Sequence, residues 1–121
     1  MMNNLSKVVV SQLLAFTIFG CATSPATPGS SVYLINCEEL GNYASKVGDD
    51  NYVIEFQNLR DSDIDVYWIN YEGEEVFYES VSTGDKWSQS TFVTHPWVVR
   101  EKSGNCVAAY QSSSTVRIDI R

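Results

Sequence analysis

Residues 64–71, IDVYWINY, give the clearest strand signal in this chain. Successive side chains of a β-strand point to opposite faces, so residues two apart share a face. One face would carry Ile64, Val66 and Trp68, and the other would carry Tyr67, Ile69 and Tyr71. Because both faces are apolar or aromatic, we predict that the strand either lies inside a sheet or presents one face as a binding surface.

Short β-rich runs separated by brief turns extend from this strand in both directions. They cover residues 51–58, 76–81, 86–92, 97–102, 106–110 and 114–120. Gly73 and Gly84 mark two of the turns, and in the last run Val116, Ile118 and Ile120 would face the core. About seven strands without helical periodicity favour an all-β domain, an antiparallel sandwich or small barrel, and we predict the β-sandwich.

The N-terminal residues have the composition of an export signal. Residues 1–20 contain Lys7, then an apolar run too short to span a bilayer, and Gly20 before Cys21. This order resembles a bacterial lipobox, so we predict a lipoprotein-type signal peptide and lipidation of Cys21. The alternative is ordinary secretion, with cleavage near Ala22 and no lipid.

A change of composition after the signal marks the start of the domain. Residues 21–31 are small, polar and interrupted by proline, which predicts a flexible tether. The folded domain would then occupy residues 32–121. Within it, residues 37–43 fit either a short strand or one helical turn.

The chain is acidic, with a formal net charge of −7. Loss of Lys7 with the signal peptide would bring the charge to −8. Nucleic acid requires a basic protein face, so it is not an expected partner.

The predicted export decides the expected chemistry of the three cysteines. With Cys21 assigned to lipid, Cys37 and Cys106 remain as a pair in an oxidising compartment, where a disulfide is expected. Two buried free thiols are the alternative.

Catalysis and metal binding find little support in the sequence. His95 is the only histidine, so it alone could act as an imidazole base, and no serine lies in a GxSxG elbow. The acidic spacing of Asp61, Asp63, Asp65 and Glu72 superficially matches a calcium loop, but Val66 stands where such a loop requires glycine. A single histidine also argues against a zinc site. We therefore predict no enzyme activity, no metal site and no cofactor.

Five residues combine aromatic faces with hydrogen-bonding groups: Trp68, Tyr78, Thr91, His95 and Trp97. Indole and phenol rings can pack against a small ring, while a hydroxyl and an imidazole can bind one hydroxyl group. From composition alone, all five could equally belong to the core of a sandwich.

Four segments resemble the β domain of the von Hippel–Lindau tumour suppressor family: VIEFQN, VYWINYEGEEVFY, STGDKW and QSTFVTHPWVVR, within about Val53 to Tyr110. The resemblance implies a seven-stranded antiparallel sandwich that binds a hydroxylated proline in an extended peptide. It implies that Trp68, Tyr78 and Trp97 wall the proline ring, and that Thr91 and His95 bind its hydroxyl.

The chain also departs from that family. Thr91 stands where the best-known member has serine, which keeps the hydroxyl and adds a methyl group. Asn58 and Asn70 match asparagines that are expected to secure turns. The tumour suppressors continue into a helical domain that recruits a ubiquitin ligase, whereas only eleven residues follow Tyr110 here. Ligase recruitment is therefore not expected.

These observations lead to one main hypothesis and two alternatives. The main one is a non-catalytic peptide-recognition module in the bacterial cell envelope, periplasmic or at the outer membrane, that contacts the membrane only through a lipid at Cys21. The alternatives are an envelope scaffold with a degenerate pocket and a binder of another hydroxylated ring, such as a sugar.

Overall fold

The computed structural model describes residues 32–121, which form eight strands and one short helix. The predicted signal peptide at 1–20, the lipidation site Cys21 and the tether at 21–31 lie outside the described residues. The elements are β1 (Val32–Ile35), the 3-10 helix η3 (Cys37–Asn42), β2 (Asn51–Asn58), β3 (Ile64–Ile69), β4 (Glu75–Val81), β5 (Lys86–Phe92), β6 (Trp97–Glu101), β7 (Cys106–Ser112) and β8 (Val116–Ile120).

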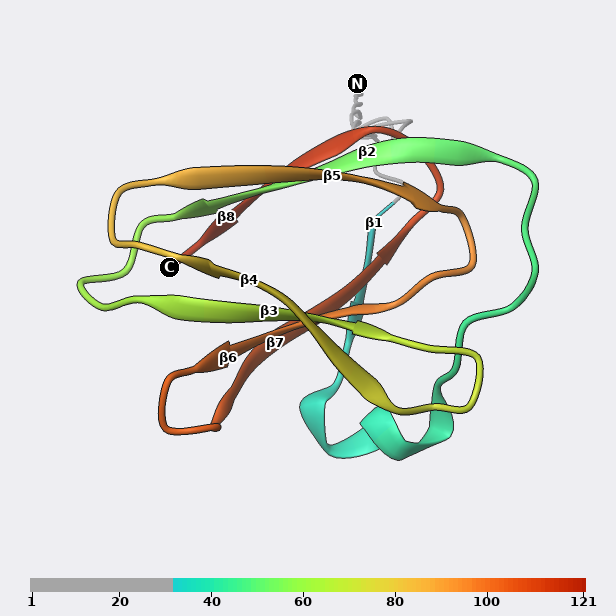
Figure 1. Ribbon diagram of the computed structural model, residues 1–121, viewed down its shortest axis with the longest axis horizontal. Helices are drawn as coiled ribbons and strands as arrows, with labels where there is room; N and C mark the ends of the chain where they lie inside the picture. Colours follow the sequence, from blue (N-terminus) through green and yellow to red (C-terminus); the bar gives the residue numbers. More distant parts are fainter. Residues whose placement is uncertain (1–31) are drawn as a thin grey trace, which may run out of the picture. The chain divides into compact units, whose positions relative to one another are not determined.

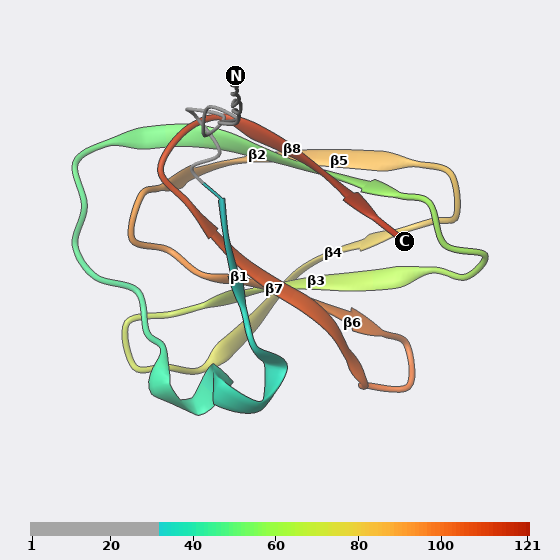
Figure 2. The same ribbon diagram turned by 180° about the vertical axis from the view of Figure 1, so that it is seen from behind.

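The strands form two sheets, which confirms the predicted β-sandwich (Figure 1). One sheet has the order β1-β7-β6-β3-β4 and the other has the order β5-β2-β8. Every strand pair is antiparallel except β2 and β8, which run parallel. This parallel pair departs from the antiparallel prediction. It arises because the chain crosses from β7 to the other sheet before β8 begins, as Figure 2 shows from behind.

Strand β3 lies between β6 and β4, as its two apolar faces predicted. Ile64 and Val66 are fully buried in the main core between the sheets. The register between β3 and β4 shifts after Val66, and Ile69 is buried in a second, smaller cluster with Leu40 of η3. Each face of β3 therefore contributes buried side chains to a core, and Asp65 is the one charged residue of the strand.

The N-terminal strand β1 is the element that the sequence pattern did not reveal. It has four residues, of which only Ile35 is buried, and it pairs with β7 far along the chain. Helix η3 follows it and resolves the choice between strand and helical turn at residues 37–43. The Cys37–Cys106 disulfide is present and joins the start of η3 to the start of β7.

The two family asparagines secure turns, as expected. Asn58 is fully buried, and its side-chain amide donates to the backbone carbonyls of Ser62 and Val81, each at 2.9 Å. The Asn70 side-chain oxygen accepts from the backbone N–H of Glu74 at 2.8 Å, across a turn in which Gly73 has a φ of 83°. A positive φ favours glycine, because a side chain there would clash with the backbone. These turns fix both ends of β3.

Candidate functional site

One cavity of about 140 Å³ is lined by all five aromatic and hydrogen-bonding residues that the sequence singled out. They come from four strands and one turn: Trp68 from β3, Tyr78 from β4, Thr91 from β5, His95 from the turn after β5, and Trp97 from β6. Tyr71, Ser90 and Phe92 complete the lining. The chain passes from one sheet to the other between β5 and β6. This crossing brings Thr91 of one sheet to the same cavity as Trp68, Tyr78 and Trp97 of the other.

Three aromatic rings form the walls of the pocket. The ring centroids of Tyr78 and Trp97 lie 4.8 Å apart at 81°, and those of Trp68 and Tyr78 lie 6.2 Å apart at 76°. These edge-to-face contacts hold the rings in fixed orientations. Trp97 is 2% exposed whereas Tyr78 is 39% exposed, so the pocket has a buried floor and an accessible rim. Trp87 packs against Tyr78 and Trp97, and the sequence did not reveal this supporting contact.

The Thr91 hydroxyl is buried and oriented by its neighbour. The indole N–H of Trp97 donates to Thr91 Oγ1 at 2.9 Å. A hydroxyl can accept and also donate one hydrogen bond. Within residues 32–121, no hydrogen bond uses the Thr91 proton, so this group can donate to a ligand.

The His95 imidazole is also buried, and its Nε2 lies 3.2 Å from the Tyr71 hydroxyl. Burial lowers the pKa of His95 from its ordinary value, and a hydrogen bond to the Lys46 backbone partly opposes this effect. The neutral ring therefore prevails near neutral pH. The hydrogen bond between Tyr71 and Nε2 takes its direction from the tautomer, and Nε2 is the acceptor when the other ring nitrogen carries the proton.

Ser45 positions the Trp68 ring and was not foreseen from the sequence. The Trp68 indole N–H donates to Ser45 Oγ at 2.9 Å, and the Ser45 hydroxyl donates to the carbonyl of Ile69 at 2.5 Å. With its only polar group occupied, the Trp68 ring can offer its apolar face to a ligand. Ser45 lies in a loop distant in sequence, and no local pattern marks it.

Tyr71 was predicted on the face of β3 opposite Trp68, yet it lines the same pocket. Alternation holds only within a strand, and β3 ends at Ile69. The turn that follows directs Tyr71 toward Trp68, with ring centroids 5.6 Å apart. The end of the strand, rather than its alternation, decides which side Tyr71 faces.

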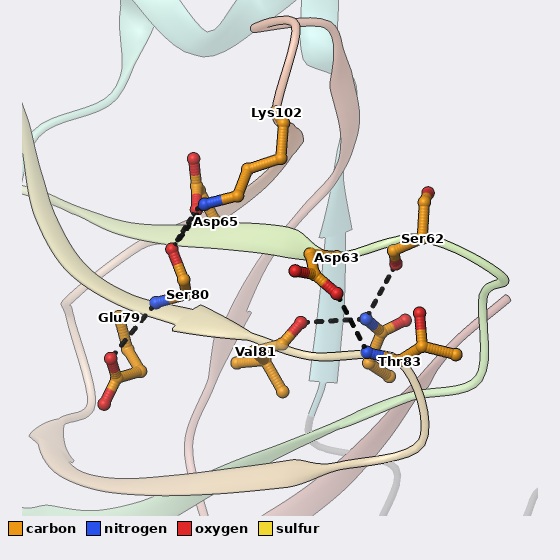
Figure 3. Close-up of polar contacts among 9 residues, drawn as sticks. Ser62, Asp63, Asp65, Glu79, Ser80, Val81, Thr83 and Lys102 are labelled. Atoms are coloured by element: carbon orange, nitrogen blue, oxygen red, sulfur yellow. Dashed lines mark hydrogen bonds and ion pairs between the residues drawn. The ribbon is translucent and has the colours of Figure 1, made fainter.

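Two acidic residues at the start of β3, Asp63 and Asp65, bind neighbouring segments through hydrogen bonds and an ion pair (Figure 3). The Asp65 carboxylate lies 2.8 Å from Lys102 Nζ and accepts a hydrogen bond from the Ser80 hydroxyl. The Asp63 carboxylate accepts from the backbone N–H of Thr83 at 3.2 Å. These carboxylates therefore join β3 to the neighbouring hairpins.

A larger open groove of about 700 Å³ lies near β1, β7 and the C-terminal end of β8. Leu34, Val107, Tyr110 and Ile120 give it mainly apolar sides. It lacks the converging aromatic and hydroxyl groups of the smaller cavity, so the smaller cavity is the better candidate for selective recognition of a polar ring.

The fold and the pocket together define a β-sandwich protein with a small aromatic binding site between its sheets. The family model described as VHL beta domain matches residues 44–112, a range that contains all five pocket residues. The chain belongs to the VHL beta domain family. No curated protein matches the chain.

Proposed function

We propose that this protein is a non-catalytic recognition module that binds an extended peptide through a hydroxylated proline ring. VHL beta domains are a family of peptide-recognition modules. Binding of a hydroxylated proline ring is supported by one observation: three aromatic walls, one hydrogen-bond donor and one acceptor converge on a single small cavity.

The aromatic walls suit a small, mainly apolar ring such as pyrrolidine. Trp68, Tyr78 and Trp97 approach the cavity from three different strands. Apolar contact with such rings is favourable and needs no charge on the ligand. The rings are already held by contacts with one another, so little conformational entropy would be lost on binding.

The polar groups of the pocket match a hydroxyl group in both directions. Thr91 can donate its proton to the ligand oxygen, and His95 Nε2 can accept the ligand proton. A prolyl ring would leave the buried Thr91 proton unpaired and could not bond to His95, which costs free energy relative to the hydroxylated ring. Discrimination between the two rings by a factor of about 10³ or more is expected on this basis.

The position of the pocket suits an extended chain. Tyr78 lies on β4, which is an edge strand of its sheet and has exposed side chains along most of its length. An edge strand has unpaired backbone groups that can bind an added strand. A peptide could therefore pair with β4 while one of its rings enters the cavity.

The disulfide indicates a non-reducing, exported environment. The described residues contain no helix suited to crossing a membrane. We place the protein in the bacterial cell envelope, exported by the signal at 1–20 and anchored through lipid on Cys21. Ubiquitin-ligase recruitment has no role in that setting. Mass spectrometry of the mature N-terminus tests the anchor: an unmodified end at Ala22 or beyond would contradict it.

Calorimetry with paired peptides tests the proposed function. Two peptides of the same sequence, one with hydroxyproline and one with proline, are titrated into the disulfide-bonded domain. We expect measurable binding of the hydroxylated peptide only. A library of hydroxylated peptides is required because the flanking sequence is not specified by the pocket. Equal binding of both forms, or no binding across the library, would contradict the proposal.

A further inference from the structure

The Tyr71 side chain covers part of the pocket and bonds to one of its polar groups. Its hydroxyl lies 3.2 Å from His95 Nε2, and the two ring centroids lie 5.5 Å apart at 89°. The ring also contacts Trp68 edge to face. Unlike the buried His95, Tyr71 is 48% exposed and follows the end of β3.

This contact occupies the imidazole nitrogen, Nε2, to which the ligand hydroxyl is proposed to bond. A neutral imidazole has one protonated nitrogen and one nitrogen with a lone pair. In the tautomer with the proton on the other nitrogen, Nε2 holds the lone pair, and the Tyr71 hydroxyl already uses it. That lone pair cannot accept well from two hydroxyl groups at once.

We infer that Tyr71 is a specificity-determining residue whose hydroxyl competes with the ligand hydroxyl for His95 Nε2. This inference rests on the proposed function of the pocket. A hydroxylated ring replaces one O–H···N bond with another, and Tyr71 moves into solvent. A ring without a hydroxyl cannot replace that bond, so it gains nothing by displacing Tyr71.

The position of Tyr71 allows this movement at little cost to the core. Half of the side chain is already exposed, and it lies in the turn between β3 and β4 rather than within a strand. The Asn70 side chain holds the backbone of this turn through the Glu72 and Glu74 N–H groups. Rotation about side-chain bonds can therefore release Tyr71 without unpairing β3.

The variant Tyr71→Phe tests the inference by removing only the competing hydroxyl. We expect it to bind a hydroxyprolyl peptide about 2- to 10-fold more tightly than the wild-type chain, the range for one hydrogen bond. Affinity for the matched prolyl peptide should not increase. The control is Tyr33→Phe, which removes a phenol hydroxyl from β1, a residue 66% exposed and outside the pocket. Its affinity should equal that of the wild type.

A second measurement uses the wild-type chain and does not depend on the variant folding. The NMR signals of the Tyr71 ring should shift toward solvent-exposed values when the hydroxyprolyl peptide is added. Unchanged signals in a saturated complex would overturn the inference, as would unchanged or weaker binding by Tyr71→Phe. If neither the wild type nor Tyr71→Phe binds any hydroxyprolyl peptide, the proposed function fails and the inference falls with it. If the wild type binds selectively but Tyr71→Phe gains nothing, only the role of Tyr71 is wrong.

Discussion

The main core and the pocket are neighbouring regions of one sandwich that share Trp97 but otherwise differ in their side chains. The main core is largely aliphatic, and Ile54, Phe56, Ile64 and Val66 are all fully buried in it. The pocket is aromatic, and its polar groups bond to one another: Trp97 to Thr91, and Tyr71 to His95. Burial of apolar area explains the first region. It does not explain why the second retains a hydroxyl and an imidazole.

Under the proposed function, the first region serves the fold and the second serves recognition. The main core is closed to a partner, whereas Tyr71 and Tyr78 at the rim of the pocket are each more than one-third exposed. A pocket wall that is held by hydrogen bonds between side chains can remain open when no ligand is bound. Changes in the two regions should therefore have separable effects on stability and on binding.

Removal of the disulfide should have the largest effect and should weaken both regions together. Cys37 and Cys106 are 69 residues apart, and their link restricts the unfolded chain. The double variant Cys37→Ser/Cys106→Ser should lose about 4 kcal/mol of unfolding free energy in the chain-entropy model. Urea unfolding measures this change. A loss below about 1 kcal/mol would show that the link contributes little to the fold.

Truncation in the core should reduce stability while leaving the pocket intact. Ile54→Ala removes a fully buried side chain from β2 and should cost about 2–5 kcal/mol. Val53→Ala is the matched control, because Val53 is the preceding residue of β2 and is 39% exposed. Urea unfolding compares the two, and calorimetry should give unchanged affinity for the folded Ile54→Ala variant. Weaker peptide binding by that folded variant would break the separation between the regions.

Thr91 connects the pocket to the main core, because it accepts a hydrogen bond from Trp97, which belongs to both regions. Thr91→Val keeps the shape of the side chain but leaves the Trp97 indole N–H unpaired, which should cost about 1–3 kcal/mol of unfolding free energy. It should also remove the discrimination between hydroxyprolyl and prolyl peptides. Thr91→Ser retains the hydroxyl and should preserve that discrimination. If Thr91→Val is less stable but discriminates as well as wild type, Thr91 serves the fold alone.

Lowering the pH should cause the smallest loss of unfolding free energy, through protonation of His95. Its pKa is lowered in the folded chain, so the unfolded chain binds this proton more readily. The stabilisation that results from this pKa difference is fully present above pH 6.5, the ordinary pKa of histidine. It is lost as the pH falls from 6.5 through the lower pKa of the folded chain. Unfolding free energy measured against pH should show this loss, and His95→Gln should remove it. An identical decrease in both chains would assign it to other groups.

Much of the fold was predictable because it depends on local alternation. The runs at 51–58 and 64–71 correspond to β2 and β3, and the glycine turns lie between strands. β1 was not predictable, because its four residues form a strand only through pairing with the distant β7. The parallel pairing of β8 likewise depends on where the chain crosses between sheets.

The five residues that line the cavity were selected from residue types and family spacing, but the hydrogen bonds within the cavity were not predictable. Thr91 and Trp97 were both selected, yet nothing in the sequence showed that one donates to the other. Tyr71 and Ser45 were missed because a turn and a distant loop bring them to the site. Such contacts depend on tertiary structure and have no local sequence pattern.

The central claim is that His95 binds the ligand hydroxyl, and the single histidine of the chain allows a direct test. The measurement is the ¹⁵N NMR signal of the imidazole during titration of the wild-type domain with hydroxyprolyl and prolyl peptides. We predict that the hydroxyprolyl peptide shifts the Nε2 signal as it saturates the protein, and that the prolyl peptide does not. Saturable binding of the hydroxyprolyl peptide with an unchanged imidazole signal would contradict the claim.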